Sequence, residues 1–379
     1  MFKNKIYKHL SSEIFRNFAT ILLTFTAIAW TVRAVNFLDL MIDNGYSATI
    51  YFKYSLLNIF TIISRFIPLA FLLALVISII KFERQQELLI LWTSGLNKIK
   101  VANLLFLISF IIALLQITLS LIINPLTLNK SRALLRETES IQVESTLRSN
   151  DFSDTFKGVT FYIDNKDSNG ELKNIFIKDN TGSLKTIVSE IDSSNNVTIL
   201  AQKGFVGDGK LILFNGTMQT LNDRKIITSV DFKKTELSIS NFSSRTITQP
   251  KIQETASNTL IKCMLVKKKT MILENCPFKN KSVVIETLSR RLGMPLYIPL
   301  ISIIVSFLLI YKKEKKYIFL RKYIIFSVAF IILIFAEILL RFVGFSSLFF
   351  ILYFLFPFLL AIILYAFLIN NVNSEKIAK

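Results

Sequence analysis

The chain has 379 residues, of which 52% are hydrophobic, and its 45 lysines and arginines exceed its 26 aspartates and glutamates to give a formal net charge of +19. A soluble domain of similar apolar content distributes such residues through one core, whereas this chain concentrates them in long separate blocks, which argues against a soluble protein. On such a chain a basic excess favours anionic lipid over nucleic acid as a partner. One histidine and two cysteines exclude a Cys/His zinc site and a histidine-dependent catalytic triad. We therefore expect no metal, no cofactor and no catalytic residues.

Six apolar runs are long enough to cross a membrane, which takes about 20 mostly apolar residues. The runs cover residues 18–38, 54–80, 101–123, 295–310, 323–340 and 348–369. The third run is expected to end at Asn124-Pro125, and residues 292–294 can extend the fourth, which is the shortest. The first run is too long for a signal-peptide core and no small-residue cleavage site follows it, so we expect a retained helix.

Charges in the short connecting segments predict the orientation. Cations gather before the first run, after the second and after the fourth, at Lys3, Lys5, Lys8, Arg16, Lys81, Arg84, Lys98, Lys100, Lys312, Lys313, Lys315, Lys316, Arg321 and Lys322. The alternate segments, residues 39–47 and 344–347, contain no lysine or arginine. The positive-inside rule therefore places both termini on the cytoplasmic side of a bacterial inner membrane and residues 124–292 on the periplasmic side.

The long segment between the third and fourth runs reads as β-structure. Short β-branched and aromatic stretches such as GVTFYI and NIFIK alternate with turn signals such as DNKDSNG and DNTG. This spacing predicts a sandwich or jelly roll, followed by an amphipathic connector. The predicted fold is an α-helical membrane protein with six transmembrane helices (3+3) and an inserted all-β periplasmic jelly-roll domain. The boundaries are 1–130, 131–285 and 286–379.

The loop after the second run predicts a short helix over residues 83–93, and Gly95 suits the left-handed position that follows a helix C-terminus. Leu88 and Leu91 would share one face by helical spacing. The residues alone leave two interpretations open: a helix that couples the protein to a cytoplasmic motor, or a solvated helix lying on the membrane. In the first interpretation, the coupling residues are Glu83, Glu87, Trp92 and Gly95.

Arginines accumulate near the predicted outer ends of the spans, against the positive-inside trend. A charge at the centre of a membrane helix costs on the order of 2.5–3.5 kcal/mol, and less near the ends, where arginine can snorkel. Because arginine binds phosphate through two parallel hydrogen bonds, these residues are candidates for binding a phosphorylated amphiphile. The alternatives are snorkelling to lipid phosphate and, for Glu337 and Arg341, an i,i+4 ion pair. The candidates are Arg33, Arg136, Arg290, Arg291 and Arg341.

A glycine-rich segment and a pair of cysteines each allow more than one interpretation. Residues 204–210 match G-x4-G-K, but Leu211 replaces the Ser or Thr that would hold Mg²⁺ and no helix follows, so we interpret the segment as a hairpin turn. No other phosphate loop occurs, and we expect no nucleotide hydrolysis by this chain. Cys263 and Cys276 both lie on the predicted outer side, where oxidation can occur, and the sequence leaves a disulfide and two free thiols open.

With these features in place, the chain resembles the LptF/LptG permease family over nearly its whole length, in the order three spans, β-jelly roll, three spans. The similar stretches are RAVNFLDLMIDNGYS at 33–47, RFIPLAFLLALV at 65–76, QELLILWTSG at 86–95 and ETLSRRLGMPLYIPL at 286–300. The first and last resemble LptF more than LptG. The bulky run at residues 88–92 departs from the family's usual alanine-containing stretch, which puts the detailed docking geometry in doubt.

The resemblance implies a non-catalytic permease subunit of an ABC-type exporter that extracts lipopolysaccharide from the outer leaflet of the inner membrane. It implies as partners an LptG-like (or LptF-like) sister permease, a cytoplasmic LptB-type ATPase dimer and an LptC-type single-span periplasmic protein. The family's docking glutamate matches Glu87, and a basic residue near the outer end of its first helix matches Arg33. In the family, lipid enters between the first and fifth helices of opposite subunits.

Two other functions fit parts of the pattern. A permease for another lipid or for lipoproteins usually places its large domain after the first helix, and the 3+3 division argues against it. A membrane scaffold that transports nothing needs neither six spans nor arginines at membrane depth.

Overall fold

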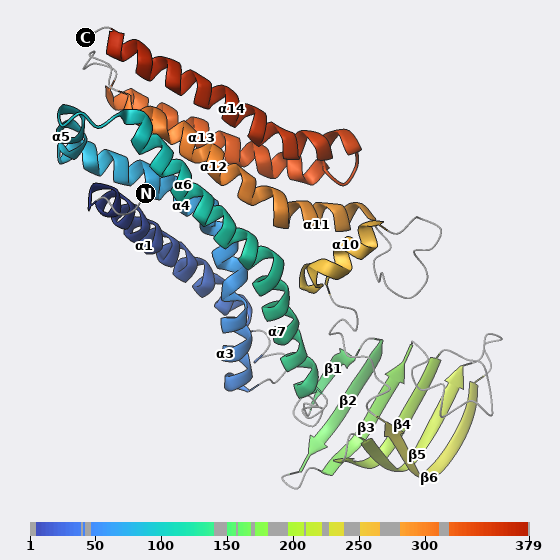
Figure 1. Cartoon of the computed structure of the whole chain (residues 1–379). Helices are drawn as coiled ribbons and strands as arrows, with labels where there is room; N and C mark the ends of the chain where they lie inside the picture. The colour runs from blue at the N-terminus through green and yellow to red at the C-terminus, as the bar shows by residue number, and fades with distance from the viewer. Residues whose placement is uncertain are drawn as a thin grey trace. The chain divides into compact units, whose positions relative to one another are not determined.

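The computed structural model describes residues 5–38, 41, 47–139, 150–156, 158–167, 171–180, 196–207, 210–221, 227–238, 251–265, 281–310 and 318–377. The chain divides into two compact units (Figure 1). The helix unit comprises Met1–Val32, Leu57–Asn129 and Lys251–Lys379, and the sheet unit comprises Arg33–Leu56 and Lys130–Pro250.

The sheet unit contains one antiparallel sheet in the described part of the chain. Its strands are β1 (Asp151–Phe156), β2 (Val159–Lys166), β3 (Glu171–Asp179), β4 (Asn196–Gly207), β5 (Lys210–Leu221) and β6 (Ile227–Ser238). Each strand pairs with the next one in sequence. The inserted all-β structure is therefore confirmed, and its described strands form a sequential meander in one sheet rather than two stacked sheets. Gly207 pairs with Lys210 in the β4–β5 hairpin, which confirms the predicted turn.

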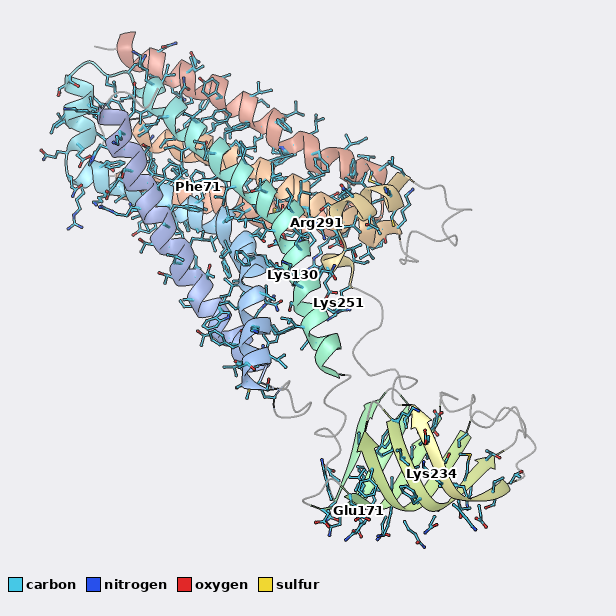
Figure 2. All side chains as sticks on the ribbon, turned by 60° about the horizontal axis from the view of Figure 1, so that its bottom comes forward. Phe71, Lys130, Glu171, Lys234, Lys251 and Arg291 are labelled. Carbon is cyan, nitrogen blue, oxygen red and sulfur yellow. The ribbon has the colours of Figure 1, made fainter. Side chains whose placement is uncertain are left out.

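Alternation along the strands gives the sheet one apolar face and one charged face. The apolar face consists of Val159, Phe161, Ile163, Leu172, Ile175, Ile177, Val197, Ile199, Ala201, Leu211, Leu213 and Leu237. On the other side, Glu236 accepts hydrogen bonds from Lys234 and Lys210, which hold the pKa of its carboxyl below the usual range. Glu171 and Lys234 are labelled in Figure 2.

Six helical spans in the described residues are long and apolar enough to cross a membrane, as the sequence predicted. They are Lys5–Asn36, Ala48–Arg84, Lys98–Leu135, Lys281–Leu309, Leu320–Phe342 and Ser347–Ser374. Their main helices are α1 (Lys5–Asn36), α3 (Ala48–Leu57), α4 (Ile59–Arg84), α6 (Lys98–Thr118), α7 (Asn124–Glu139), α11 (Lys281–Gly293), α12 (Tyr297–Ser306), α13 (Ile318–Phe342) and α14 (Ser347–Ile377). The shorter elements are α5 (Glu87–Thr93), the π-helical turn η1 (Leu119–Ile123), the 3₁₀ turns η3 (Ile252–Glu254), η5 (Met294–Leu296) and η6 (Phe307–Leu309), and α10 (Ser257–Leu265).

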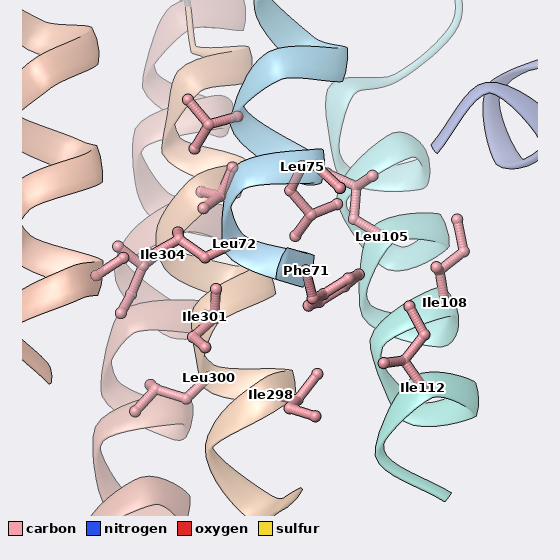
Figure 3. Close-up of a cluster of buried hydrophobic side chains, with 14 of the residues drawn as sticks. Phe71, Leu72, Leu75, Leu105, Ile108, Ile112, Ile298, Leu300, Ile301 and Ile304 are labelled. Carbon is pink, nitrogen blue, oxygen red and sulfur yellow. The ribbon is translucent and has the colours of Figure 1, made fainter. Parts of the chain in front are cut away.

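The core of the helix unit is built around α4 and α12. In the spans that contain α4 and α12, 67% of the residues in an 18-residue apolar stretch are buried, whereas in the spans formed by α1 and α14 only 11% are buried. Figure 3 shows the α4 side chains Phe71, Leu72 and Leu75 among those of α6 and α12, namely Leu105, Ile108, Ile112, Ile298, Leu300, Ile301 and Ile304. A helix that is apolar all round has to be buried, whereas α1 and α14 leave broad apolar faces for lipid or a partner.

The third span does not end where the sequence indicated. The expected stop at Asn124-Pro125 is wrong, because the helix continues through this pair as α7. The π-helical turn Leu119–Ile123 comes immediately before Pro125. Such a turn is a common local adjustment where a helix accommodates an interruption, and it lets the chain pass the proline without leaving the helix.

Prolines inside the spans leave carbonyl groups that side chains from other segments satisfy. Proline has no N–H to donate to the carbonyl four residues before it. Pro68 thus frees the carbonyl of Ser64, and Gln116 Nε2 of α6 donates to that oxygen at 3.2 Å.

The same arrangement recurs at two other prolines. The carbonyl of Leu121, four residues before Pro125, accepts a hydrogen bond from Ser257 Oγ at 2.7 Å. The carbonyl of Tyr353, four residues before Pro357, accepts one from the Tyr297 hydroxyl at 3.0 Å. Because hydrocarbon offers no water to replace these donors, each proline joins its helix to a second segment of the helix unit.

The connector into the fourth span carries one of the two cysteines. Cys263 is buried on α10 and is disulfide-bonded. Cys276 lies outside the described residues.

A double-mutant cycle tests the role of the proline-freed carbonyls. Tyr297→Phe should lower the free energy of unfolding by about 1 kcal/mol, because the Tyr353 carbonyl loses its donor. In a Pro357→Ala background, residue 357 regains an N–H for that carbonyl, and the cost should fall close to zero. Denaturant unfolding in detergent measures both costs. As a control, Tyr365→Phe, which removes a hydrogen bond to Asn103, should cost the same in both backgrounds. Equal costs of Tyr297→Phe in the two backgrounds would contradict the interpretation.

Candidate functional site

The helix unit contains a cavity of about 480 Å³. It lies between the N-terminal turns of α4, the α6–η1–α7 helix, α11 and the C-terminal turns of α13. It is lined by Thr61, Ser64, Arg65, Pro68, Gln116, Ser120, Asn124, Leu128, Gln253, Val283, Glu286, Thr287, Arg290, Arg291, Met294, Glu337 and Arg341. The cavity is rich in charge, with four arginines and two glutamates. Arg65 lies near the start of α4, and α5 follows the end of α4. At 1.5 Å per residue, about 27 Å of helix separates Arg65 from Glu83, which lies beside α5.

Arg290 is held by two carboxylates of this cavity. Its guanidinium lies 2.6 Å from Glu337 Oε1 on α13 and 3.6 Å from Glu286 Oε1 on α11. The alternative i,i+4 pair of Glu337 with Arg341 is not formed. In the described part of the chain Arg341 has no ion-pair partner, and its side chain is exposed. It is therefore the arginine of this group best placed to bind an anion from outside the chain.

Arg291 is buried and directs its guanidinium at the protein. It donates to Ser257 Oγ at 2.7 Å and to the carbonyls of Gln253 and Thr255, each at 3.0 Å. Its own carbonyl accepts a hydrogen bond from Ser120 Oγ at 2.8 Å. Arg291, labelled in Figure 2, thus fastens the connector to the α11 helix and to η1. These contacts favour a structural role over the substrate contact expected from the sequence.

The remaining two candidate arginines are not among the described side chains that line this cavity. Arg33 is half-buried in the last turn of α1 and belongs to the sheet unit. Arg136 lies on α7, and its side chain is outside the described residues. The structure therefore brings together Arg290, Arg291 and Arg341 and adds Arg65.

Several polar residues of the cavity were missed by the sequence analysis, although their spacing was visible. Gln116, Ser120 and Asn124 recur every four residues in the third apolar run, so they share one helix face. Thr61, Ser64 and Arg65 in the second run lie at positions i, i+3 and i+4, which also share one helix face. Polar residues aligned on one face of a membrane helix generally face a cavity or a packed interior, and this pattern is the signal that could have found them.

A second candidate site is the short helix α5. Its predicted start at Glu83 is wrong, because α4 continues to Arg84 and the chain then turns at Gln86, which has a left-handed backbone with φ 60°. Its predicted end is confirmed. Gly95 has φ +85°, and the N–H groups of Gly95 and Leu96 donate to the carbonyls of Trp92 and Leu91, the pattern of a Schellman motif.

Two of the predicted coupling residues, Glu83 and Glu87, lie on different helices and contact different helices. Glu83, at the end of α4, forms an ion pair with Lys322 of α13 at 2.8 Å. Glu87, in the first turn of α5, contacts His9 of α1 at 3.3 Å. A third link nearby is the buried carboxylate of Glu13 on α1, which accepts a hydrogen bond from Lys81 of α4. Three helices and α5 are therefore tied together at this end of the helix unit.

The shared face of Leu88 and Leu91 that the spacing predicted is confirmed, and this face points into the helix unit. Leu88 is buried, and Leu91 and Trp92 pack against the core. The Lys98 ammonium lies 5.8 Å from the centre of the Trp92 ring. The large apolar side chains that α5 leaves free are Leu89 and Ile90, which are 57% and 64% exposed. An exposed apolar pair beside an acidic residue suits contact with another protein.

Comparison with known proteins agrees with the arrangement of spans and sheet. The model of the family "Lipopolysaccharide export system permease LptF/LptG" matches residues 8–371. A protein of Rickettsia prowazekii (strain Madrid E), described as uncharacterized, is 23% identical over 283 residues, which are 73% of this chain and 74% of that protein. The family match covers nearly the whole chain but does not distinguish LptF from LptG. Six membrane-spanning helices around an inserted sheet, with this match, show that the chain belongs to the LptF/LptG family, the non-catalytic permease subunits of the ABC-type lipopolysaccharide export system.

Proposed function

We propose that this chain is the LptF-like subunit of the exporter and that it extracts lipopolysaccharide from the outer leaflet of the inner membrane. Its partners in this proposal are an LptG-like sister permease, an LptB-type ATPase dimer at α5 and an LptC-type protein that receives the lipid. The observation that supports it most directly is the arginine-lined cavity, which lies at the far end of the spans from α5.

The distribution of cations supports the orientation. Lysines and arginines are frequent in the segments beside α5, including Lys81, Arg84, Lys98 and Lys100. The positive-inside rule makes that side cytoplasmic. The cavity then lies toward the periplasmic leaflet, where lipopolysaccharide waits for export, and the sheet unit lies in the periplasm.

Energy explains why a separate motor is needed. Withdrawing an acyl chain from hydrocarbon costs about 0.8 kcal/mol for each CH₂, and lipopolysaccharide carries several chains. No single binding event returns so much, so the lipid has to be moved in steps driven by ATP hydrolysis. This chain would supply the anion-binding cavity and the helix on which the ATPase acts.

In this proposal the arginines have different roles. Arg341 and Arg290 bind phosphate groups of the lipid. Arg33 and Arg136 are further lipid-binding residues that belong to the sheet unit. Arg291 stabilises the wall of the cavity. At the other end, the ATPase contacts Leu89, Ile90 and Glu87 of α5. The ion pairs of Glu83 and Glu87 would pass its movement to α13 and α1.

Two arginine variants separate binding from structure. Arg341→Gln should weaken lipopolysaccharide binding by the purified complex about tenfold, the effect of losing one charged hydrogen bond, without changing the unfolding temperature. Arg291→Gln should lower the unfolding temperature by several degrees, because three protein acceptors lose their donor. Lys100→Gln removes a positive charge at the opposite end and should do neither. Unchanged lipid binding in Arg341→Gln would refute the assignment of that residue.

Co-purification with the ATPase tests the docking helix. Glu87→Lys or Leu89→Asp should abolish recovery of the ATPase with the permease and stop export, because each places an unfavourable charge in the contact. Gln85→Lys adds a charge in the adjacent turn, and His9→Gln removes only the contact of Glu87 with α1, so both should retain the ATPase. Full ATPase binding and export by Glu87→Lys would disprove docking through this residue and favour a helix that simply lies on the membrane.

A further inference from the structure

Three buried oxygen atoms of the cavity have no hydrogen-bond partner in the described part of the chain. They are Thr61 Oγ1, Gln116 Oε1 and Asn124 Oδ1. All three side chains line the cavity and are at least nine-tenths buried. A buried polar atom without a partner is costly. The two amide oxygens can only accept, so they require donors from whatever occupies the cavity, and the Thr61 hydroxyl can accept from the same donors.

The orientation of the two amides follows from their partners. Gln116 Nε2 donates to the carbonyl of Ser64, which can only accept. Asn124 Nδ2 donates to Ser64 Oγ at 2.7 Å, and Ser64 Oγ donates its own hydrogen to the Thr61 carbonyl. Turning the Gln116 amide round would set its oxygen against the Ser64 carbonyl, which is also an acceptor. Turning the Asn124 amide round would take the Ser64 hydroxyl hydrogen away from the Thr61 carbonyl. The amide oxygens are thus held toward positions that only a donor can satisfy.

The other part of the cavity has the opposite character. Arg341 and Arg290 offer N–H donors, and the four arginines outnumber the two glutamates. A phosphate suits these groups. A phosphate without neighbouring donors would leave the two amide oxygens unsatisfied, and an acyl chain would satisfy neither part.

We propose that this cavity selects a phosphate group that carries hydroxyl or ammonium donors beside it. The phosphate contacts Arg341 and Arg290, and the donors contact the acceptor floor, defined as Thr61, Gln116 and Asn124. The volume of about 480 Å³ lies within the range of small-ligand pockets, so it holds a headgroup and not the acyl chains. Two sources provide this chemistry, the phosphorylated sugar of lipopolysaccharide and a phosphoglycerol or phosphoethanolamine headgroup. The first source rests on the proposed function.

Three phospholipids test the acceptor floor in the complete, delipidated permease complex, and two of them, phosphatidylethanolamine and phosphatidylcholine, have the same net charge. Phosphatidylethanolamine and phosphatidylcholine share the phosphate, but the trimethylated choline has no N–H. We expect the complex to bind phosphatidylethanolamine and phosphatidylglycerol about tenfold more tightly than phosphatidylcholine, as measured by native mass spectrometry and by the shift in unfolding temperature. Equal binding of the three lipids, or no binding of any, overturns the proposal and leaves ordered water as the occupant of the floor.

Variants at Pro68 and Gln116 remove the Gln116 oxygen from the acceptor floor without leaving the Ser64 carbonyl unpaired. Gln116→Met alone would strand the Ser64 carbonyl, whereas Pro68→Ala restores an N–H for it. The double variant Pro68→Ala with Gln116→Met should therefore fold and lose the preference for donor-bearing lipids. Pro68→Ala alone should keep that preference. A double variant that still prefers phosphatidylethanolamine to phosphatidylcholine contradicts the role of the floor.

A competition arm identifies the source. If added lipopolysaccharide displaces bound phosphatidylglycerol, the cavity is a substrate site. If lipopolysaccharide binds without displacing it, the cavity holds a resident phospholipid, and the selection rule stands. ATP-driven release of lipopolysaccharide by the wild-type complex tests the proposed function separately, so the two ideas can fail independently.

Discussion

The helix unit depends on one constraint of the membrane interior, which is that every backbone carbonyl needs a donor where water is absent. Prolines break this rule locally, and at three of them a side chain from another segment supplies the missing donor. Gln116, Ser257 and Tyr297 each donate to the carbonyl four residues before a proline. These contacts join α4 to α6, η1 to the connector, and α14 to α12, so sequence features that interrupt helices become the links between them.

The same contacts shape the candidate site. Gln116 uses its amide nitrogen on the Ser64 carbonyl, and its oxygen is thereby turned toward the cavity. The Ser257 hydroxyl donates to the Leu121 carbonyl and accepts a hydrogen bond from the guanidinium of Arg291, so this arginine forms part of the cavity wall. A cavity with donors on one side and acceptors on the other thus follows from how the chain accommodates Pro68 and Pro125.

Composition and periodicity were sufficient for the membrane spans and the inserted sheet, because hydrophobic length and strand alternation are local properties. The Gly95 turn was predictable for the same reason. Pairings that depend on the packing of separate helices were not. Glu337 is four residues from Arg341, yet it pairs with Arg290, forty-seven positions away, since α11 packs against α13. The donor to the carbonyl four residues before Pro125 is likewise a distant residue, Ser257, which a search for helix breakers does not consider.

The two ends of the helix unit are connected by α4 and α13. The first carries Arg65 at the cavity and Glu83 beside α5, and the second carries Glu337 at the cavity and Lys322 beside α5. These pairs are separated by about 27 Å and about 22 Å of helix. Glu83 and Lys322 form an ion pair at one end, and Glu337 on α13 pairs with Arg290 of α11 at the other. In the proposed cycle, a displacement of α5 that moves α4 would therefore also act on α13. In the proposed export cycle, the ATPase would therefore act on the arginines of the cavity through two stiff helices, with no need for a flexible relay.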